Sequence, residues 1–423
     1  MESQHQQKVS TADLEVGMYV ARLDRPWAGT PFLFQGFFIE SQDDIDELRR
    51  ICQYVYIDLE RHYEENPRAK ARGTGNYSAT TEVTSTNLVK TRVDSRSDRA
   101  NRTLSASSRS MEEELPASKQ AYDEANHAMH EMITKLETDG RLDVQLAVVA
   151  VEPMVESVLR NPDAMIWLTR MKRHHAYMYN HSVSSAIWGV AFARHLGLSK
   201  AGLREIGLGC MLFDVGKTKL PQTLLAKPDK LNETEWHVVR NHVQYSLNLL
   251  EGASEVTRTT QDLVRWHHER HDGSGYPDGL KENEIPMSAK IAGMVDSYDA
   301  ITTARPYSHL RSPYEAVREI YTWRGTLFQS EVVEQFMQVV GVFPTGSLVE
   351  LNNGSVAVVL AQNDTRRLKP RVMLVLDENK QRLPQFTTVD LMFDSHLKGA
   401  DKLWIEKGLE PGAYGVDPEE LYL

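Results

Sequence analysis

The chain has 423 residues, of which 41% are hydrophobic and 25% charged, a composition typical of a folded protein with about two or three domains. Its 48 Lys and Arg residues against 59 Asp and Glu residues give a formal charge of −11, which argues against nonspecific nucleic-acid binding but leaves a small phosphorylated ligand open. Two cysteines, Cys52 and Cys210, argue against a disulfide framework or a Cys-rich zinc site, and the apolar runs are shorter than the roughly 20 residues of a membrane span, so we expect a cytoplasmic protein.

Residues 1–62 predict a small α+β domain. Apolar residues spaced as in a helix alternate there with short runs of strand-forming residues. The expected elements are strands over Gly17–Ala21, Phe32–Ile39 and Val55–Ile57 and a helix over Asp43–Cys52. Residues 63–112 are rich in Ser, Thr, Lys and Arg and poor in apolar side chains, which predicts a flexible linker.

Helical periodicity dominates residues 113–343 and predicts a helical domain. Ser199 and Asn232 are expected N-caps, and Glu235 would complete a capping box with Asn232. The expected helices are Ala121–Leu136, Val144–Leu159, Tyr179–Leu196, Lys200–Leu212, Glu233–Leu250, Glu255–His268, Met287–Thr303, Pro313–Thr322 and Ser330–Gly341.

Residues 344–423 change to strand-forming composition. Strands are expected over Ser347–Leu351, Ser355–Ala361 and Arg371–Asp377, with a hairpin turn at Asn352-Asn353-Gly354 between the first two. The predicted fold class is therefore mainly α, with a helical bundle core, a small α+β N-terminal domain and a small β C-terminal appendage.

Histidines are concentrated in the helical region, where nine of the fifteen lie between His174 and His271. Residues of metal-ligand type recur there at intervals of one helix plus one loop, so that successive helices of a bundle could each supply a ligand to one site. Imidazole and carboxylate without thiolate suit Fe, Mn or Zn in a hydrolytic site. The recurring residues are His181, Asp214, His242, His267-His268 and Asp296.

A glycine-containing loop directly follows two of these candidate ligands, in the segment HHERHDGSGYPDGL that starts at His267. Glycine lets backbone N–H groups approach a phosphate closely. Pro277 restricts the exit of the loop, and Tyr276 offers a ring and a hydroxyl group. Joined to two histidines, the loop is a much more specific signal than a turn alone.

This segment, together with VDSYDAITTARPY, resembles the HD-GYP subgroup of HD-domain phosphohydrolases over about residues 170–340. The resemblance implies an HD-type helical bundle around a centre of two or three metal ions. For this chain we expect one or two divalent metal ions, with Fe or Mn as the first choice. The resemblance also implies a phosphodiesterase that hydrolyses cyclic dinucleotides, cyclic di-GMP to linear pGpG or GMP, in bacterial signalling. The stretch LEVGMYVARLDRPW resembles the small domain of unknown function that often precedes HD-GYP domains.

Carried over to this sequence, the resemblance implies roles for individual residues. Asp214 and Lys217 are the implied catalytic residues, and Asp214 would bridge the metals. A cyclic dinucleotide is the implied ligand. The loop that contains Gly275, Tyr276 and Pro277, which we call the GYP loop, is the implied surface for a signalling protein partner. The implied metal ligands are His181, Asp214, His242, His267, His268 and Asp296, and the implied substrate contacts are Gly275, Tyr276, Pro277 and Arg305.

The sequence departs from the family pattern at three positions. Phe213 stands where the family has the His of the HD pair, Tyr177 where three-metal members have Glu, and Ser308 where a basic residue is usual. Phenylalanine cannot coordinate a metal, so the first metal keeps only His181, Asp214 and Asp296. Three interpretations stay open: a weakened but working phosphodiesterase, a metal-poor module that binds cyclic dinucleotide without turnover, and other phosphohydrolase chemistry.

Overall fold

The computed structural model describes residues 6–24, 37–39, 42–58, 107–171, 177–227, 229–303, 311–363, 369–392, 403–410 and 412–416. The chain divides into two compact units, Met1–Arg92 and Val93–Leu423. Most of the predicted linker lies outside the described residues. Among the helices that are described, none combines the length and the apolar composition needed to cross a membrane.

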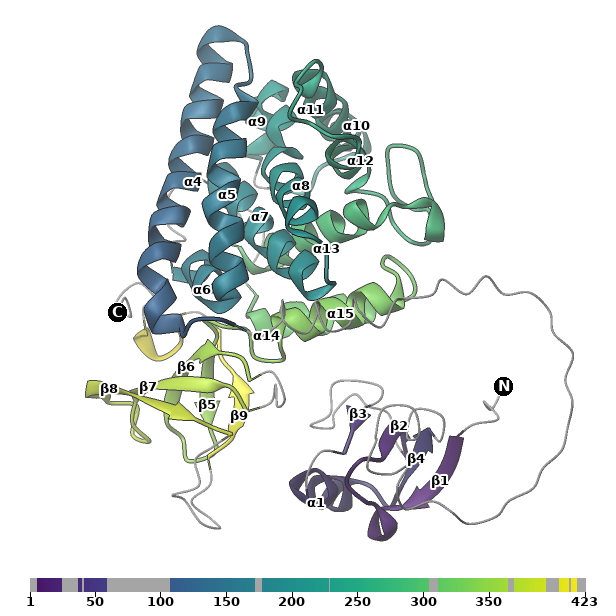
Figure 1. The fold of residues 1–423 in the computed structure, drawn as a ribbon, viewed down its shortest axis with the longest axis vertical. Helices are drawn as coiled ribbons and strands as arrows, with labels where there is room; N and C mark the ends of the chain where they lie inside the picture. Colours follow the sequence, from purple (N-terminus) through teal and green to yellow (C-terminus); the bar gives the residue numbers. More distant parts are fainter. Residues whose placement is uncertain are drawn as a thin grey trace, which may run out of the picture. The chain divides into compact units, whose positions relative to one another are not determined.

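Among its described residues, the first unit contains an antiparallel sheet in the order β1-β4-β2-β3 and the helix α1 (Gln42–Ile51) (Figure 1). Its core is formed by aliphatic side chains of the sheet and of α1, among them Val20, Ile45 and Val55. β1 was not expected from the sequence, because this edge strand has mostly polar, exposed residues and lacks an apolar alternation. The strands are β1 (Gln6–Ser10), β2 (Tyr19–Leu23), β3 (Phe37–Phe38) and β4 (Tyr54–Asp58).

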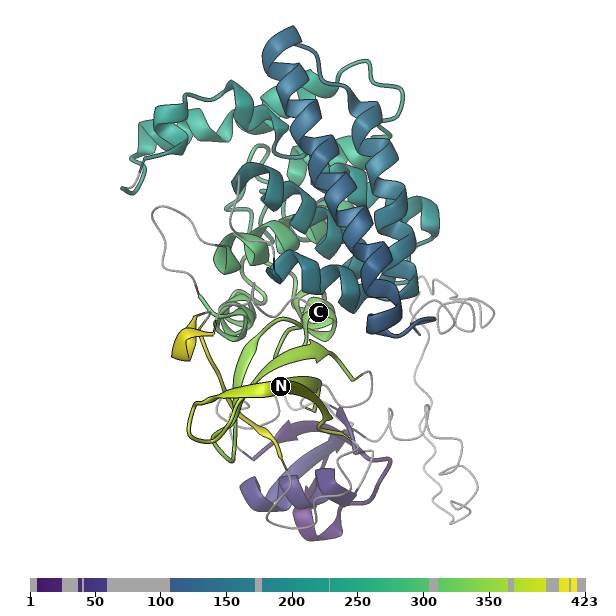
Figure 2. The same cartoon turned by 90° about the vertical axis from the view of Figure 1, so that its left-hand side faces the viewer.

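The second unit begins with a long helix, α4 (Met111–Asp139), which packs along α5 (Val144–Arg160) (Figures 1 and 2). α4 starts well before the predicted Ala121, because Ser110 and Glu113 form a capping box at its N-terminus. Three further helices follow, of which the first was not expected from the sequence: α6 (Pro162–Met171), α7 (Tyr177–His195) and α8 (Lys200–Leu212).

The helix predicted over Glu233–Leu250 is in fact two helices, α10 (Glu233–Arg240) and α11 (His242–Leu250). Asn241 separates them as the C-cap of α10, where its backbone N–H donates to the carbonyl groups of Val238 and Val239, and Asn favours helix ends over helix interiors. The predicted N-caps Ser199 and Asn232 are confirmed, the second as a capping box. The other helices are α9 (Gln222–Leu225), α12 (Arg258–Trp266), α13 (Met287–Thr302), α14 (Pro313–Thr322) and α15 (Ser330–Val340).

The C-terminal region folds into an antiparallel sheet in the order β8-β7-β6-β5-β9. This sheet is the β appendage predicted at the C-terminal side, and its apolar side chains share one core with Met111 at the start of α4 and with Ala164 and Trp167 of α6. β8 and β9 were not expected from the sequence. The strands are β5 (Leu348–Leu351), β6 (Val356–Ala361), β7 (Arg371–Leu376), β8 (Arg382–Asp390) and β9 (Ile405–Gly408).

Candidate metal centre

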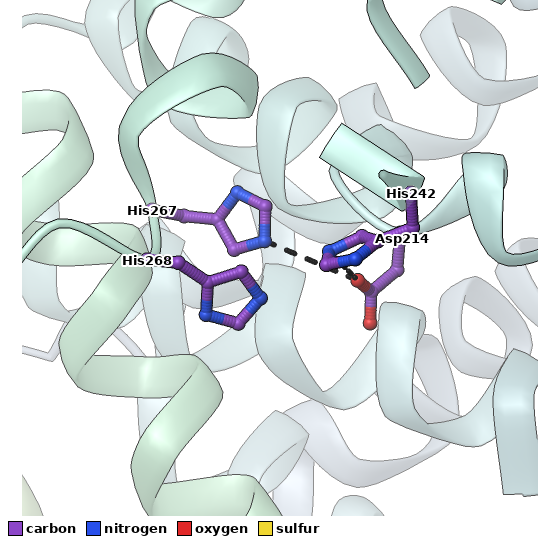
Figure 3. A group of neighbouring side chains, drawn as sticks. All are labelled: Asp214, His242, His267 and His268. Carbon is purple, nitrogen blue, oxygen red and sulfur yellow. Dashed lines mark ion pairs between the residues drawn. The ribbon is translucent and has the colours of Figure 1, made fainter. Parts of the chain in front are cut away.

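The candidate ligands come from helix ends that meet inside the second unit. Asp214 follows the last turn of α8 and begins the short 3-10 turn Val215–Lys219. His242 is the first residue of α11, and His267 caps the C-terminus of α12. Figure 3 shows the rings of His267 and His268 directed from one backbone segment toward Asp214 and His242 on two others.

Four of these residues form what we call the histidine cluster: Asp214, His242, His267 and His268. One ligand atom from each lies within 4.8 Å of all the others, and none of the four side chains is exposed. Nε2 of His242 lies 3.4 Å and Nε2 of His267 lies 4.0 Å from Oδ1 of Asp214. The arrangement has the donor set and the closeness that a divalent transition metal requires.

The tautomers of two ligands are set by backbone carbonyl groups. Nδ1–H of His242 donates to the Val239 carbonyl oxygen at 2.7 Å, and Nδ1–H of His267 donates to the Val264 carbonyl oxygen at 2.8 Å. The Nε2 atom of each neutral ring therefore carries a lone pair that faces Asp214. A hydrogen bond to the second ring nitrogen is the usual way in which proteins orient a metal-ligating histidine.

Three acceptor atoms consequently face one another without a proton between them. Within the described part of the chain, Asp214 Oδ1, His242 Nε2 and His267 Nε2 are buried and have no hydrogen-bond partner. Buried polar atoms without partners are costly, and three facing lone pairs also repel one another. A bound cation would satisfy all three, so the residues of the histidine cluster fit a metal ion.

A second group, which we call the aspartate cluster, consists of His181, Asp214 and Asp296. Nε2 of His181 lies 3.1 Å from Asp296 Oδ1 and 3.4 Å from Asp214 Oδ2. On the other side of the ring, Nδ1–H donates to Asp299 Oδ2 at 2.7 Å. This group, unlike the first, is held together by hydrogen bonds among its own members.

The histidine pKa values are shifted in opposite directions in the two clusters. Burial lowers the pKa of His267 to about 4 and also lowers those of His242 and His268. Burial acts in the same direction on His181, but the hydrogen bonds that its ring donates to the carboxylates of Asp214, Asp296 and Asp299 outweigh it and raise the pKa of His181 well above its usual value. The three histidines of the histidine cluster are thus neutral at pH 7, and His181 is protonated.

Phe213 lies at the border between the two clusters and is completely buried. Its ring stacks on His267 with the ring centres 4.7 Å apart and meets His181 edge-on at 5.8 Å. At the position of the family's histidine, the side chain is therefore a hydrocarbon ring that offers no metal ligand. Phe213 caps the C-terminus of α8, and its carbonyl group accepts a hydrogen bond from Ser246 of α11.

The turn that carries Asp214 is fastened to α11 by Ser246, which sequence reasoning did not single out. Ser246 Oγ–H donates to the Phe213 carbonyl oxygen at 2.8 Å, and the backbone N–H of Gly216 donates to Ser246 Oγ at 2.8 Å. A Cβ atom at Gly216 would lie 2.1 Å from the carbonyl oxygen of His242, so only glycine lets the turn approach α11 this closely.

Lys217 completes the surroundings of Asp214. Its ammonium group forms an ion pair with Asp214 Oδ2 and is partly exposed, whereas Asp214 is buried. Burial raises the pKa of Asp214, but Lys217 and His181 outweigh this effect and hold the pKa well below its usual range. Asp214 is therefore ionised, with one oxygen atom toward each cluster.

The GYP loop packs on the histidine cluster. The ring of Tyr276 stacks on that of His268 with the centres 4.6 Å apart, and the guanidinium group of Arg240 lies 5.0 Å above Tyr276. The carboxylate of Glu269 accepts the backbone N–H groups of residues 278–280 at 2.7–3.0 Å and so anchors the loop. A Cβ atom at Gly275 would lie 2.4 Å from the Arg270 backbone nitrogen, so this glycine serves close packing of the loop.

The structure thus brings together most residues that the sequence singled out. His181, Asp214, Lys217, His242, His267, His268 and Asp296 meet in one place, with Gly275, Tyr276 and Pro277 beside them. Arg305 and Ser308 lie outside the described residues, as does the side chain of Tyr177. Asp299, Ser246 and Glu269 were missed, although the spacing of Asp296 and Asp299 on one helix face was a usable signal.

Three family models match the chain. Residues 6–147 match a domain of unknown function, DUF3391, and this match spans the predicted linker and α4. Residues 165–332 match the HD domain. Residues 348–398, which form most of the C-terminal sheet, match a KOW domain associated with the HD domain.

Curated relatives align with the chain over different lengths. A cyclic di-GMP phosphodiesterase of Pseudomonas aeruginosa is 32% identical over 387 residues, which cover 91% of this chain and 88% of that protein. A cyclic di-GMP phosphodiesterase of Thermotoga maritima is 38% identical over 148 residues, 35% of this chain and 40% of that protein. A 3'3'-cGAMP-specific phosphodiesterase of Vibrio cholerae is 30% identical over 154 residues, 36% of this chain and 30% of that protein.

Proposed function

Because this chain belongs to the HD-GYP family of cyclic di-GMP phosphodiesterases, we propose that it is a metal-dependent phosphodiesterase that hydrolyses cyclic di-GMP to linear pGpG and, in a second round, to GMP. The observation that carries this proposal is the set of three buried acceptor atoms in the histidine cluster, which face one another without partners. Such a set has no role in an apolar core, and it suits a cation that acts on a phosphate ester.

Asp214, His242, His267 and His268 are the residues that would hold the metal. Their nitrogen and oxygen donors suit Fe or Mn, which is our proposal for its identity. When bound, a divalent ion in such a site lowers the pKa of a water molecule and neutralises the phosphoryl oxygen atoms. Asp214 is ionised and the histidines are neutral at pH 7, so no proton has to leave a ligand before the metal binds.

Residues around the cluster would bind and orient the substrate. The Lys217 ammonium group is partly exposed next to Asp214, where it can neutralise a phosphate oxygen or hold a proton. Tyr276 fixes one wall of the site through its stack on His268, and Gly275 and Pro277 shape the loop that holds it. Arg305 remains our proposal for a phosphate or base contact on the strength of its sequence motif.

The relatives favour an enzyme over a receptor that binds without turnover. We also propose the cytoplasm as the compartment, where the two buried free cysteines stay reduced. The GYP loop is our proposed surface for a signalling protein partner. Relatives named for cyclic di-GMP and for cGAMP both occur, and the alignment over 387 residues with a cyclic di-GMP enzyme makes cyclic di-GMP our first substrate.

The test is turnover of cyclic di-GMP and of 3'3'-cGAMP by the purified full chain, with its metal content measured on the same sample. We expect hydrolysis that stops in the His267→Ala and Asp214→Ala variants, because each loses a ligand of the histidine cluster. His237→Ala is the matched control, since His237 is an exposed histidine on α10 outside both clusters. A wild type that binds cyclic di-GMP without hydrolysing it at any metal loading would establish the receptor instead.

A further inference from the structure

We infer that the protein holds one metal ion per chain, in the histidine cluster, and that the aspartate cluster holds none. The inference deepens the proposed function and rests on it for the reaction, but it concerns the occupancy of the site. It departs from the centre of two or three metal ions that the resemblance of the sequence implies.

The two clusters contrast in their hydrogen bonding. In the histidine cluster, two Nε2 lone pairs and Asp214 Oδ1 face one another and have no donor among the described residues. In the aspartate cluster, His181 places a ring nitrogen 3.1 Å from Asp296 and its other ring nitrogen 2.7 Å from Asp299. One cluster therefore needs a cation, and the other is already satisfied.

The two oxygen atoms of Asp214 also have different surroundings. Oδ1 faces the two unpartnered imidazole nitrogens, whereas Oδ2 is engaged by the Lys217 ammonium group and lies 3.4 Å from His181 Nε2. A carboxylate that bridges two metals must offer one oxygen atom to each of them. Because the second oxygen atom is taken by donors of the protein, Asp214 is arranged as the ligand of a single ion.

The ring of Phe213 acts against a second metal ion as well. It is completely buried, stacks on His267 and meets His181 edge-on, so it fills the space between the clusters with carbon. A metal in the aspartate cluster would have one imidazole, two carboxylates and an aromatic ring around it. The ring supplies no ligand and excludes the water molecules that could replace one.

The experiment is the metal content of the full chain purified with Mn²⁺, measured by elemental analysis together with the electron paramagnetic resonance spectrum. We expect about one Mn²⁺ per chain and the spectrum of an isolated ion. His267→Ala should lose the ion, and His181→Ala should retain it, since His181 is not a ligand. Two ions per chain, a spectrum of two coupled ions, or loss of the ion in His181→Ala would overturn the inference.

A second pair of variants tests the cause at position 213. Phe213→His should raise the content toward two ions and produce the coupled spectrum, because it returns a ligand to the aspartate cluster. Phe213→Leu is the control for removing the ring, and it should stay at one ion. Folding of each variant is checked by its circular dichroism spectrum without metal. If Phe213→His folds like the wild type and still binds one ion, the ring of Phe213 is not what keeps a second ion out of the aspartate cluster.

The outcomes for occupancy and for function are separate. A chain with two ions that hydrolyses cyclic di-GMP overturns this inference and leaves the proposed function intact. A chain with one ion that never turns over a cyclic dinucleotide overturns the proposed function and leaves the inference intact.

Discussion

Ser246 shows how a single hydroxyl group can govern a metal site from outside it. It is completely buried and bonded to the backbone on both sides of Asp214, at Phe213 and at Gly216. Because it belongs to the same helix as His242, it fixes the distance between these two ligands. Residues that orient ligands in this way typically change metal affinity by roughly 10–100-fold when they are lost.

We therefore predict that Ser246→Ala weakens metal binding about tenfold, because the turn that carries Asp214 is released from α11. The dissociation constant for Mn²⁺ is measured by titration of the metal-free protein. Ser118→Ala is the matched control, since Ser118 is also completely buried but is bonded to Ser157, between α4 and α5. A lower melting temperature with unchanged metal affinity would reduce Ser246 to a structural role.

At the scale of elements, α4 and α5 are joined by a buried ion pair at Glu114. Arg160 donates two hydrogen bonds to the Glu114 carboxylate, at 2.7 and 2.8 Å, and Ser157 Oγ–H donates a third at 2.9 Å. Burial raises the pKa of Glu114, but the hydrogen bonds from Arg160 and Ser157 outweigh it, and the net effect is a lowered pKa. The carboxylate is therefore ionised and fastens the first turn of α4 to the end of α5.

Glu114→Gln should lower the free energy of unfolding by about 2 kcal/mol at pH 7, because it removes a charge-assisted network. The folded-state pKa of Glu114 is below its unfolded value, so the difference between wild type and variant is complete above about pH 5 and shrinks as the pH falls through the folded-state pKa. Urea unfolding of both proteins at several pH values measures it. A difference that grows on acidification would contradict the assignment.

At the scale of the whole molecule, the helices and the C-terminal sheet of the second unit form one folded body. Trp167 of α6 is buried in the same cluster as Val356, Val358 and Met373 of the sheet. The side chain of Asp163, also on α6, accepts a hydrogen bond from Thr345 Oγ–H at 3.1 Å. Because the core is shared, the sheet and the helices should unfold together.

Trp167→Ala should destabilise the second unit by about 4 kcal/mol, the usual cost of emptying a large buried site. The loss is read from thermal unfolding followed in two spectral regions, the far ultraviolet for the helices and the near ultraviolet for aromatic packing. Trp404, which is 46% exposed, gives the control Trp404→Ala with little effect. Two separate transitions in the wild type would mean that the sheet is an independent domain.

Much of the architecture was readable from the sequence because it depends on local patterns. Apolar residues at helical spacing predicted α5, α7, α8, α13 and α14 to within a few residues, and the caps at Ser199 and Asn232 were confirmed. The break at Asn241 and the sheet's attachment to α6 were not predicted. The first turns on one residue inside a segment whose apolar spacing is otherwise helical, and the second joins residues that are far apart in the chain.

The sequence by itself determined which side chains could meet a metal and a phosphate, because ligand chemistry belongs to residue types and the motif around His267 is specific. Only the tertiary structure decided how these side chains divide. It directs Asp214 Oδ1 toward the Nε2 atoms of His242 and His267, which carry no proton. It directs Asp214 Oδ2 toward Lys217 and His181. That division depends on backbone carbonyls, on Ser246 and on the ring of Phe213, whose positions follow from how α8, α11 and α12 pack and cannot be read from spacing along one chain.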